Sequence, residues 1–258
     1  MKRGDVTVLS ISAALGAVVV VAVTYSLLVL DRSPNTFVNN SARTDSSWLV
    51  VTWGPSFCEA EPSDPRCSSG QVARMGSTLI LHGLWPQPSE NQFCGMPEAV
   101  ADRARKSPDT DMPPLRLSDE VKKSLQSTMA GFDTLAPHEW YAHGTCSGVT
   151  IDRYFSDAAA LTIAVRKVLD PVFQNAKGGR LTLGTVRDRV DEQFGAGAGG
   201  RVGLTCRKVT GNSAVVVDVR FSLPPVADLN GDNGLEGLGE LLANAKPMAS
   251  ECRRGRVP

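Results

Sequence analysis

Two of the chain's three histidines, His138 and His143, flank a glutamate in the segment "APHEWYAHGTCSG". The unperturbed pKa of imidazole, near 6.5, lets a histidine accept or donate a proton near neutral or mildly acidic pH. Glu139 beside His143 would orient the ring and raise its pKa, and the negative C-terminal end of a helix would do the same. The pattern favours a proton-transfer site. The alternative is a histidine that packs in the core or faces solvent.

A zinc site is the other chemistry to weigh. Pro137 suits the first turn of a helix and Gly144 suits the position past its end, so "PHEWYAH" predicts a two-turn helix. In that helix Glu139 and His143 share one face, whereas His138 and His143 diverge by about 140°. Zinc peptidases need H-E-x-x-H, but the spacing here is H-E-x-x-x-H, and no C-x-x-C pair occurs. We therefore expect no metal and no cofactor.

The third histidine, His82, follows an apolar run in "STLILHGLW" that predicts a buried strand. We expect His82 at the end of this strand, where its side chain can leave the core. An earlier strand is expected in "WLVVTWGPSFC", ended by Gly54 and Pro55.

The remaining pattern mixes helices and strands. A helix capped by Ser118 is predicted in "SDEVKKSLQSTM", a longer one in "DRYFSDAAALTIAVRKVLD" that stops at Pro171, and a third in "LTLGTVRDRVDEQFG". The loop "GAGAGG" lacks the context of a dinucleotide fingerprint. Two strands, "VGLTCRKV" and "AVVVDVRFSL", flank a turn at Thr210-Gly211-Asn212. Because strict βαβ alternation is absent, we predict an α+β fold with a central antiparallel β-sheet flanked by helices.

The N-terminal region predicts export. Residues 1–5 are expected to be cytoplasmic, and residues 6–30 carry no charge, which is typical of a transmembrane signal-anchor or a signal peptide. Without a clean A-x-A cleavage site the uncleaved anchor is favoured, and cleavage would make the protein secreted. Residues 31–47 predict a flexible linker, and residues 48–258 the folded domain.

Export also explains the cysteines. The six of them form an even set, which predicts three disulfides with fifteen possible pairings. Lys plus Arg equals Asp plus Glu, so the chain is no polycation, and a nucleic-acid partner would have to be held by a local site.

Two segments together, "LHGLWPQ" and "HEWYAHGTC", resemble the active-site segments of the ribonuclease T2 family of acid ribonucleases, here as a bacterial-type member. The resemblance extends over most of residues 48–258, with "TWGPSFC" similar to the family's first strand. It implies a disulfide-stabilised α+β domain. It also implies metal-free cleavage of single-stranded RNA by transphosphorylation through a 2′,3′-cyclic phosphate. DNA lacks the 2′-OH, so no DNA cleavage is expected.

The resemblance also assigns roles to residues. His143 is similar to the family's base and His82 to its acid, while Glu139 supports the phosphoryl centre and His138 binds phosphate or ribose. Substrate-binding residues follow in the same way. Trp85 and Phe93 match aromatic residues that stack on the base 5′ of the cut, with core packing as the alternative, and Gln87 replaces an aspartate that reads the base in some relatives.

One departure from the family pattern is Ala142, where relatives often have a lysine that would stabilise phosphorane charge. It motivates a second hypothesis, a low-turnover RNA-binding or toxin-like extracellular protein on the same fold. An exported zinc hydrolase is disfavoured by the histidine spacing. The resemblance further implies a single-stranded RNA substrate. We also expect a monomer, with an N-terminal membrane contact through the uncharged residues 6–30. The resemblance pairs the cysteines as Cys94 with Cys146, Cys206 with Cys252 and Cys58 with Cys67.

Overall fold

The structure, a computed structural model, describes residues 44–106, 112–229 and 234–258, which belong to one compact unit. The predicted segments 1–5 and 6–30, and most of the linker 31–47, lie outside these residues. Within the described ranges no helix has both the length and the apolar character needed to cross a bilayer. The first strand begins at Ser46, slightly before the predicted domain start at residue 48.

The helices and strands follow one another along the described chain in this order: β1 (Ser46–Trp53), α2 (Gly54–Ala60), α3 (Pro65–Ser68), α4 (Gln71–Met75), β2 (Leu79–Gln87), α5 (Glu98–Lys106), α6 (Asp119–Thr128), α7 (Phe132–Ala142), η2 (Gly144–Cys146), α8 (Ile151–Asn175), β3 (Arg180–Thr182), α9 (Leu183–Phe194), η3 (Ala198–Arg201), β4 (Val202–Lys208), η4 (Thr210–Asn212), β5 (Ala214–Leu223), η5 (Val226–Asp228), α10 (Leu235–Ala243) and β6 (Arg254–Arg256).

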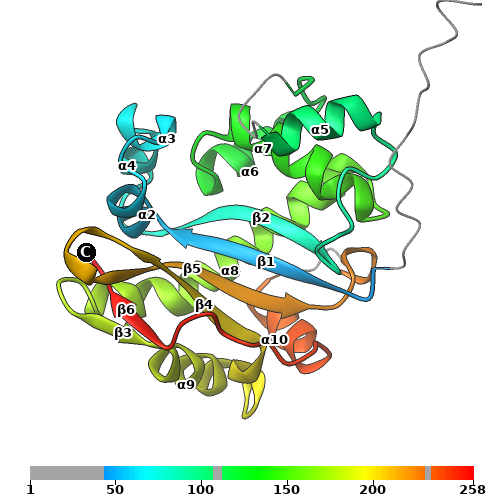
Figure 1. Cartoon of the computed structure of the whole chain (residues 1–258). Coiled ribbons are helices and arrows are strands. Elements are labelled where there is room, and N and C mark those ends of the chain that lie inside the picture. Colours follow the sequence, from blue (N-terminus) through cyan, green and yellow to red (C-terminus); the bar gives the residue numbers. More distant parts are fainter. Residues whose placement is uncertain (1–43, 107–111, 230–233) are drawn as a thin grey trace, which may run out of the picture. The chain divides into compact units, whose positions relative to one another are not determined.

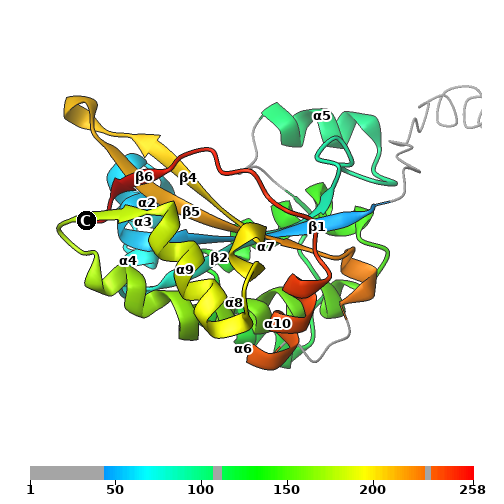
Figure 2. The ribbon, with the colours of Figure 1, turned by 90° about the horizontal axis from the view of Figure 1, so that it is seen from below.

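The strands form one sheet in the order β2-β1-β5-β6-β3, with β4 also paired to β5 (Figure 1). All neighbours are antiparallel except β5 and β6, which run parallel. Seen from below, α8, α9 and α10 lie across one face of this sheet (Figure 2). The helix α7 lies beyond the edge strand β2, and α2, α3 and α4 lie together near one end of β1 and β2 (Figure 1). The predicted α+β fold is confirmed, with one parallel pair in an otherwise antiparallel sheet.

The main core lies between the sheet and α8. Alternate residues of β1 point into it, and the fully buried Trp53 stacks on Phe173 of α8 at a ring distance of 4.9 Å. The prediction that this helix stops at Pro171 is wrong, because α8 continues to Asn175. A proline inside a helix costs about 3 kcal/mol. Burial of Phe173, beyond the proline, offsets about 1.5–3 kcal/mol of that cost.

A β-bulge in β2 corrects the predicted position of His82, which lies inside the strand and not at its end. Val50 of β1 opposes Gly83, and the next residue of β1 opposes Leu81, so His82 is the extra residue. Leu81 and Leu84 consequently both face the core although they are three apart. A regular strand alternates its faces with every residue, and a bulge interrupts that alternation. His82 is thereby turned to the face opposite the core.

A second bulge lies one strand beyond β1. In the pairing of β4 with β5, Thr205 opposes Asp218 but the next residue, Cys206, opposes Val216. Val216 and Val219 therefore both face the core, and Asp218 lies on the opposite face. Because β1 runs between β2 and β5, the two bulges bring His82 and Asp218 onto the same face of the sheet.

The described chain holds three disulfides, and one of them, with two hydrogen bonds, fixes the segments around β2. The cysteine pairs in the structure are those that the resemblance implies: Cys58–Cys67, Cys94–Cys146 and Cys206–Cys252. The second of them joins the loop after β2 to the chain after α7. Beside it the Phe93 N–H donates to the Ala142 carbonyl at 2.9 Å. The buried Tyr154 hydroxyl of α8 donates to the Leu84 carbonyl at 2.6 Å, which ties this edge strand to the long helix.

Candidate active site

The three histidines, which come from β2 and from the end of α7, lie close together. The His82 ring lies 5.3 Å from the Trp85 ring, the Trp85 ring lies 5.2 Å from that of His143, and the His143 ring lies 6.3 Å from that of His138. Trp85 thus lies between His82 and His143. The structure brings together the residues that the sequence singles out for proton transfer.

The end of α7 differs from the prediction in a way that matters for the site. The helix begins at Phe132, so Pro137 lies inside it and not in its first turn. His143 is the C-cap residue, with φ −121° and ψ −50°, so it has left the helical conformation. The predicted divergence of His138 and His143 therefore does not hold. Donor atoms of His138, Glu139 and His143 all lie within 4.8 Å of one another. The expectation of a metal-free site stays a prediction.

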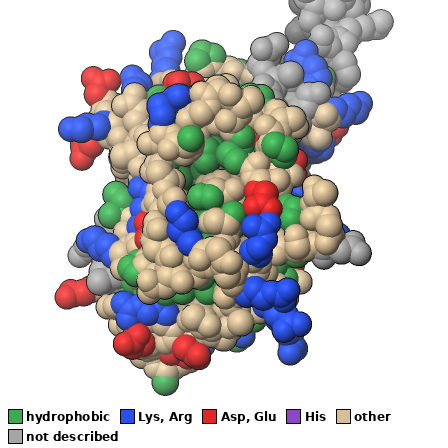
Figure 3. Space-filling view, turned by 90° about the vertical axis from the view of Figure 1, so that its left-hand side faces the viewer, with side chains coloured by type: hydrophobic (Ala, Val, Ile, Leu, Met, Phe, Trp, Pro, Cys, Tyr) green, Lys and Arg blue, Asp and Glu red, His purple; other side chains and the backbone are tan. Residues whose placement is uncertain are grey.

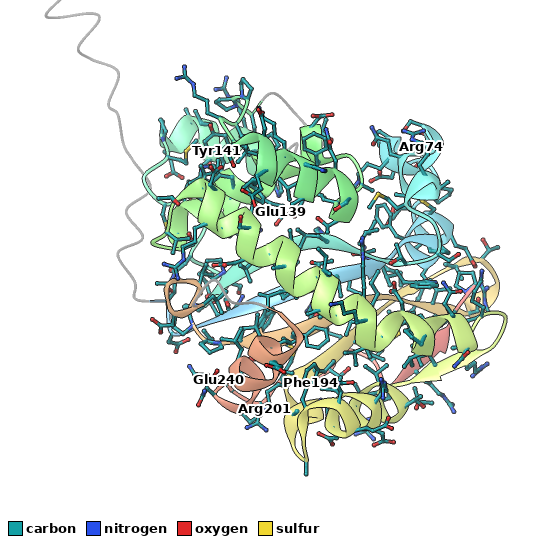
Figure 4. The ribbon with its side chains drawn as sticks, turned by 180° about the vertical axis from the view of Figure 1, so that it is seen from behind. Arg74, Glu139, Tyr141, Phe194, Arg201 and Glu240 are labelled. Atoms are coloured by element: carbon teal, nitrogen blue, oxygen red, sulfur yellow. A yellow bond between two sulfur atoms is a disulfide. The ribbon has the colours of Figure 1, made fainter. Side chains whose placement is uncertain are left out.

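Glu139 is the most enclosed polar residue of the group, at 1% exposure. Its Oε2 accepts a hydrogen bond from Trp85 Nε1 at 2.8 Å, and its Oε1 lies 3.8 Å from His82 Nε2. Figure 4 shows Glu139 inside the molecule, whereas Tyr141 of the same helix lies nearer its outer edge. The carboxylate rests on Gly83, where a Cβ would lie 1.9 Å from Oε2. The glycine in "HGLW" is therefore the residue that lets Glu139 reach the sheet.

The two flanking histidines have opposite pKa shifts. Burial lowers the pKa of His143 to about 4, helped by the positive charges of His138 and His82, although Glu139 opposes the shift. Burial also acts to lower the pKa of His82, but the carboxylates of Asp218 and Glu139 outweigh it and the net pKa is raised. Between these values His143 is neutral while His82 is protonated. This is the pairing that a base and an acid need.

His138 is partly buried, and its Nδ1 is enclosed without a hydrogen-bond partner in the described part of the chain. A buried nitrogen in that state is costly unless a ligand satisfies it. The predicted contact of His138 with phosphate or ribose is compatible with this position.

Four further residues named from the sequence, Phe93, Ala142, Gln87 and Trp85, are buried or held by hydrogen bonds. Phe93 is 1% exposed and packs with Ala142, itself 2% exposed, and with two alanines of α5. This arrangement favours core packing of Phe93 over base stacking. The Cβ of residue 142 therefore lies inside the apolar cluster around Phe93. Gln87 is 8% exposed and donates to the Trp85 carbonyl at 3.3 Å. Trp85, partly buried, uses its indole N–H on Glu139.

Sequence reasoning missed three residues near His82, namely Asp218, Thr52 and Arg66. The Asp218 Oδ1 lies 4.0 Å from His82 Nδ1 and accepts a hydrogen bond from Thr52 Oγ1 at 2.6 Å. The charge of Arg66, on α3, also acts on His82, and its guanidinium is paired with Asp64 at 2.8 Å. An aspartate inside the valine run "AVVVDVRFSL" was the available signal, since a charged residue in a buried strand needs a partner.

A small cavity borders one member of this group, His82. This cavity is lined by apolar residues of α2, α4 and β2 together with Thr52 and Arg66. Figure 3 looks onto the side that carries α2, α3 and α4, and it shows hydrophobic side chains within a hollow and Lys and Arg side chains near its edge. The His82 side chain is 33% exposed, so it is accessible to a ligand.

Residues 44–229 match the model of the ribonuclease T2 family. The chain is similar to Ribonuclease 1 of Arabidopsis thaliana, at 25% identity over 177 residues, which cover 66% of this chain and 73% of that protein. It is similar to Ribonuclease MC of Momordica charantia, at 30% identity over 122 residues, which cover 47% of this chain and 56% of that protein.

A solved structure extends the comparison to the fold. A mutant of RNase MC1 in complex with 5′-GMP matches with a TM-score of 0.52 at 21% identity, over 72% of this chain and 92% of that one. The match to the family model, which spans more than half of the sequence, establishes the relationship. The chain belongs to the ribonuclease T2 family and is an RNA-cleaving endoribonuclease.

Proposed function

We propose that the chain cleaves single-stranded RNA by transphosphorylation, with His143 as the base and His82 as the acid. The observation that carries this assignment is the position of two histidines on either side of one indole ring, with ring distances of 5.3 and 5.2 Å. The surroundings of these rings shift their pKa values in opposite directions. A base must be neutral and an acid protonated at the same pH, and these shifts open a pH range in which both conditions hold.

The chemical step needs two proton transfers and no cofactor. His143 takes the proton of the ribose 2′-OH, whose oxygen forms a bond to the adjacent phosphorus. The bond from phosphorus to the 5′-oxygen breaks, and His82 donates its proton to that leaving oxygen. The products are a 2′,3′-cyclic phosphate and a free 5′-hydroxyl. Because the attacking group is the 2′-OH of the substrate, DNA is not cleaved.

Three further residues support the phosphoryl centre in this proposal. Glu139 is held by Trp85 and lies beside His82, so it fixes the geometry between the acid and the base. His138 offers a ring nitrogen to phosphate or ribose oxygens. Arg66, whose charge acts on His82, is the candidate to replace the lysine that relatives carry where this chain has Ala142.

Ala142 also supports a second candidate, a low-turnover RNA-binding protein on the same fold. Its side chain lies in the apolar cluster of Phe93, so this position supplies no cation to a phosphate. The two candidates differ in turnover and not in RNA binding, which makes them separable by one assay.

The test uses the full-length chain, folded under oxidising conditions and incubated with single-stranded RNA in excess EDTA. We expect products with 2′,3′-cyclic phosphate ends, and no cleavage of DNA of the same sequence. His82→Ala and His143→Ala should each lower the rate by at least about 10²-fold. Near-wild-type turnover of either variant would contradict the assigned roles. RNA binding without cleavage by the folded wild type would favour the RNA-binding protein.

We further propose that the chain acts as a monomer outside the cytoplasm, attached by residues 6–30 to the cell membrane or secreted after their removal. The uncharged run of these residues and the three disulfides support export. Membranes pelleted from expressing cells and washed at high salt should retain the protein if the segment is an anchor. Recovery of a shortened chain from the medium would instead show cleavage.

A further inference from the structure

The reaction described above does not use Asp218, although this carboxylate lies beside its acid. Asp218 is 6% exposed on β5, and its Oδ1 is 4.0 Å from His82 Nδ1. The same oxygen accepts the Thr52 hydroxyl at 2.6 Å. Burial of a carboxylate is unfavourable unless charged or hydrogen-bonding groups compensate it, so its position calls for an explanation.

The groups around Asp218 keep its carboxylate charged beside His82. Arg220, two residues further along β5, is paired with Glu251 and lies over the Trp48 ring at 5.6 Å. Its charge also acts on Asp218. Burial raises the pKa of Asp218, but the interactions with His82, with the Thr52 hydroxyl and with Arg220 lower it more. Asp218 is therefore an anion wherever His82 titrates.

From this geometry we infer that Asp218 is a positioning residue for the acid: its charge, 4.0 Å from Nδ1, favours a proton on that nitrogen of His82. Nε2, which lies 3.8 Å from Glu139 Oε1, is then left to carry the catalytic proton. The bulge in β5 that turns Asp218 to this face lies beside the bulge in β2 that turns His82 to it. A carboxylate beside one ring nitrogen favours the tautomer with the proton on that nitrogen. This inference rests on the proposed function of His82.

The charged groups that face His82 come from several elements, so their effects must be separated. Glu139 comes from α7, Asp218 from β5 and Arg66 from α3. Asp64 and His143 also interact electrostatically with it. Glu139 raises the pKa of both His82 and His143, whereas Asp218 is not among the groups that shift His143. Substitution of Asp218 should therefore change the pKa of His82 alone, whereas substitution of Glu139 should change the pKa of both histidines.

Loss of either carboxylate should shift the pH–rate profile, but in a different way for each. The charge of Asp218 favours protonated His82, so removing it lowers the pKa of His82 and moves the alkaline limb of the pH–rate profile to lower pH. The acid limb, set by His143, stays in place. Removing the charge of Glu139 lowers both pKa values, so both limbs move to lower pH.

The experiment compares the wild-type chain with Asp218→Asn, each at full length with ¹⁵N-labelled histidine rings. With only three histidines, each ring can be followed by NMR as pH changes. In Asp218→Asn we expect the pKa of His82 to fall by about one unit or more, as loss of an adjacent opposite charge implies, while that of His143 is unchanged. The alkaline limb of kcat/KM on a dinucleoside phosphate should move equally. Thr52→Val, which keeps the charge, should leave the pKa of His82 above its value in Asp218→Asn.

An equal His82 pKa in wild type and Asp218→Asn would overturn the inference, and so would a neutral wild-type His82 with its proton on Nε2. The tautomer is read from wild-type ¹⁵N shifts, so the test survives even if the variant does not fold. NMR titration needs no cleavage. A lowered His82 pKa in a protein without RNase activity would support the role of Asp218 and overturn only the proposed function.

Discussion

His82 and His143 are the same side chain in two different settings. His82 stands at a bulge of the sheet, one third exposed, with a carboxylate on each side of its ring. His143 caps α7, where it shares Glu139 with His82 but has another histidine as its neighbour. Burial acts in the same direction on both rings, and the charges around them decide the outcome.

The difference teaches how one site can hold an acid and a base of the same residue type. Glu139 serves both histidines, so it cannot by itself separate their pKa values. The separation comes from Asp218, which raises the pKa of His82 but does not act on His143. Burial therefore prevails at His143, helped by the charges of His138 and His82, whereas the two carboxylates prevail at His82. Environments that push two titratable groups apart mark their acid and base roles.

The largest effect on this arrangement should come from Gly83→Ala. The added Cβ would lie 1.9 Å from Glu139 Oε2 and 2.5 Å from Trp85 Nε1, so both side chains between the two histidines must move. Displacement of catalytic groups by about 1 Å can lower a rate by about 10²-fold. We expect kcat/KM for RNA to fall by about that factor while the disulfides still form.

The matched control is Gly200→Ala, a glycine with no heavy atom within 4 Å of the added Cβ. It should keep wild-type kcat/KM. Full activity in Gly83→Ala would mean that Glu139 and Trp85 need not hold their observed positions. Glu139 could then not be the group that both histidines depend on.

The pH dependence of the wild type tests the comparison directly. The base is neutral only above the His143 pKa of about 4, and the acid is protonated only below the raised pKa of His82, which lies above 6.5. The profile of kcat/KM should therefore be a bell with its acid limb near pH 4 and its alkaline limb above pH 6.5. Beyond each limb the rate should change about tenfold per pH unit.

A dinucleoside phosphate measured from pH 3 to pH 9 would supply this profile. A profile that stays flat from pH 4 to pH 8 would contradict the two roles. If both limbs instead lie close to pH 6.5, the two histidines have similar environments in solution, and the opposite shifts described here are wrong.

The sequence predicted the fold class and most elements because local patterns specify them. Ser118 caps α6 as expected, and a short apolar run marks β1. The end of α8 was wrong because the burial of Phe173 against Trp53 is a tertiary contact that Pro171 does not reveal. Local propensity gives way to packing when the packed residue is large.

For the site, sequence motifs identified the histidines but not how their side chains are arranged in space. Helical geometry predicted that His138 and His143 diverge, yet His143 lies beyond the helix and turns back. Asp218 was missed because its partner, His82, is far away in the sequence and reaches it only through two bulges on either side of β1. Bulges leave little sequence signal beyond apolar residues that lie three apart, such as Leu81 and Leu84.

The smallest effect should come from Tyr154→Phe, which removes a bond behind the site and not within it. The Tyr154 hydroxyl donates to the Leu84 carbonyl at 2.6 Å, next to the glycine on which Glu139 rests. Loss of this buried bond should lower the free energy of unfolding by about 1–3 kcal/mol, because the carbonyl stays enclosed.

Denaturant unfolding would measure the loss. The matched control is Tyr141→Phe, because Tyr141 is only partly buried and lies nearer the outer edge of the molecule, so the change should affect stability little. We expect kcat/KM of Tyr154→Phe to fall only a few-fold, since both histidines keep their charged neighbours. An activity loss as large as that of Gly83→Ala would instead show that the backbone of β2, more than the charges on its face, sets the difference between His82 and His143.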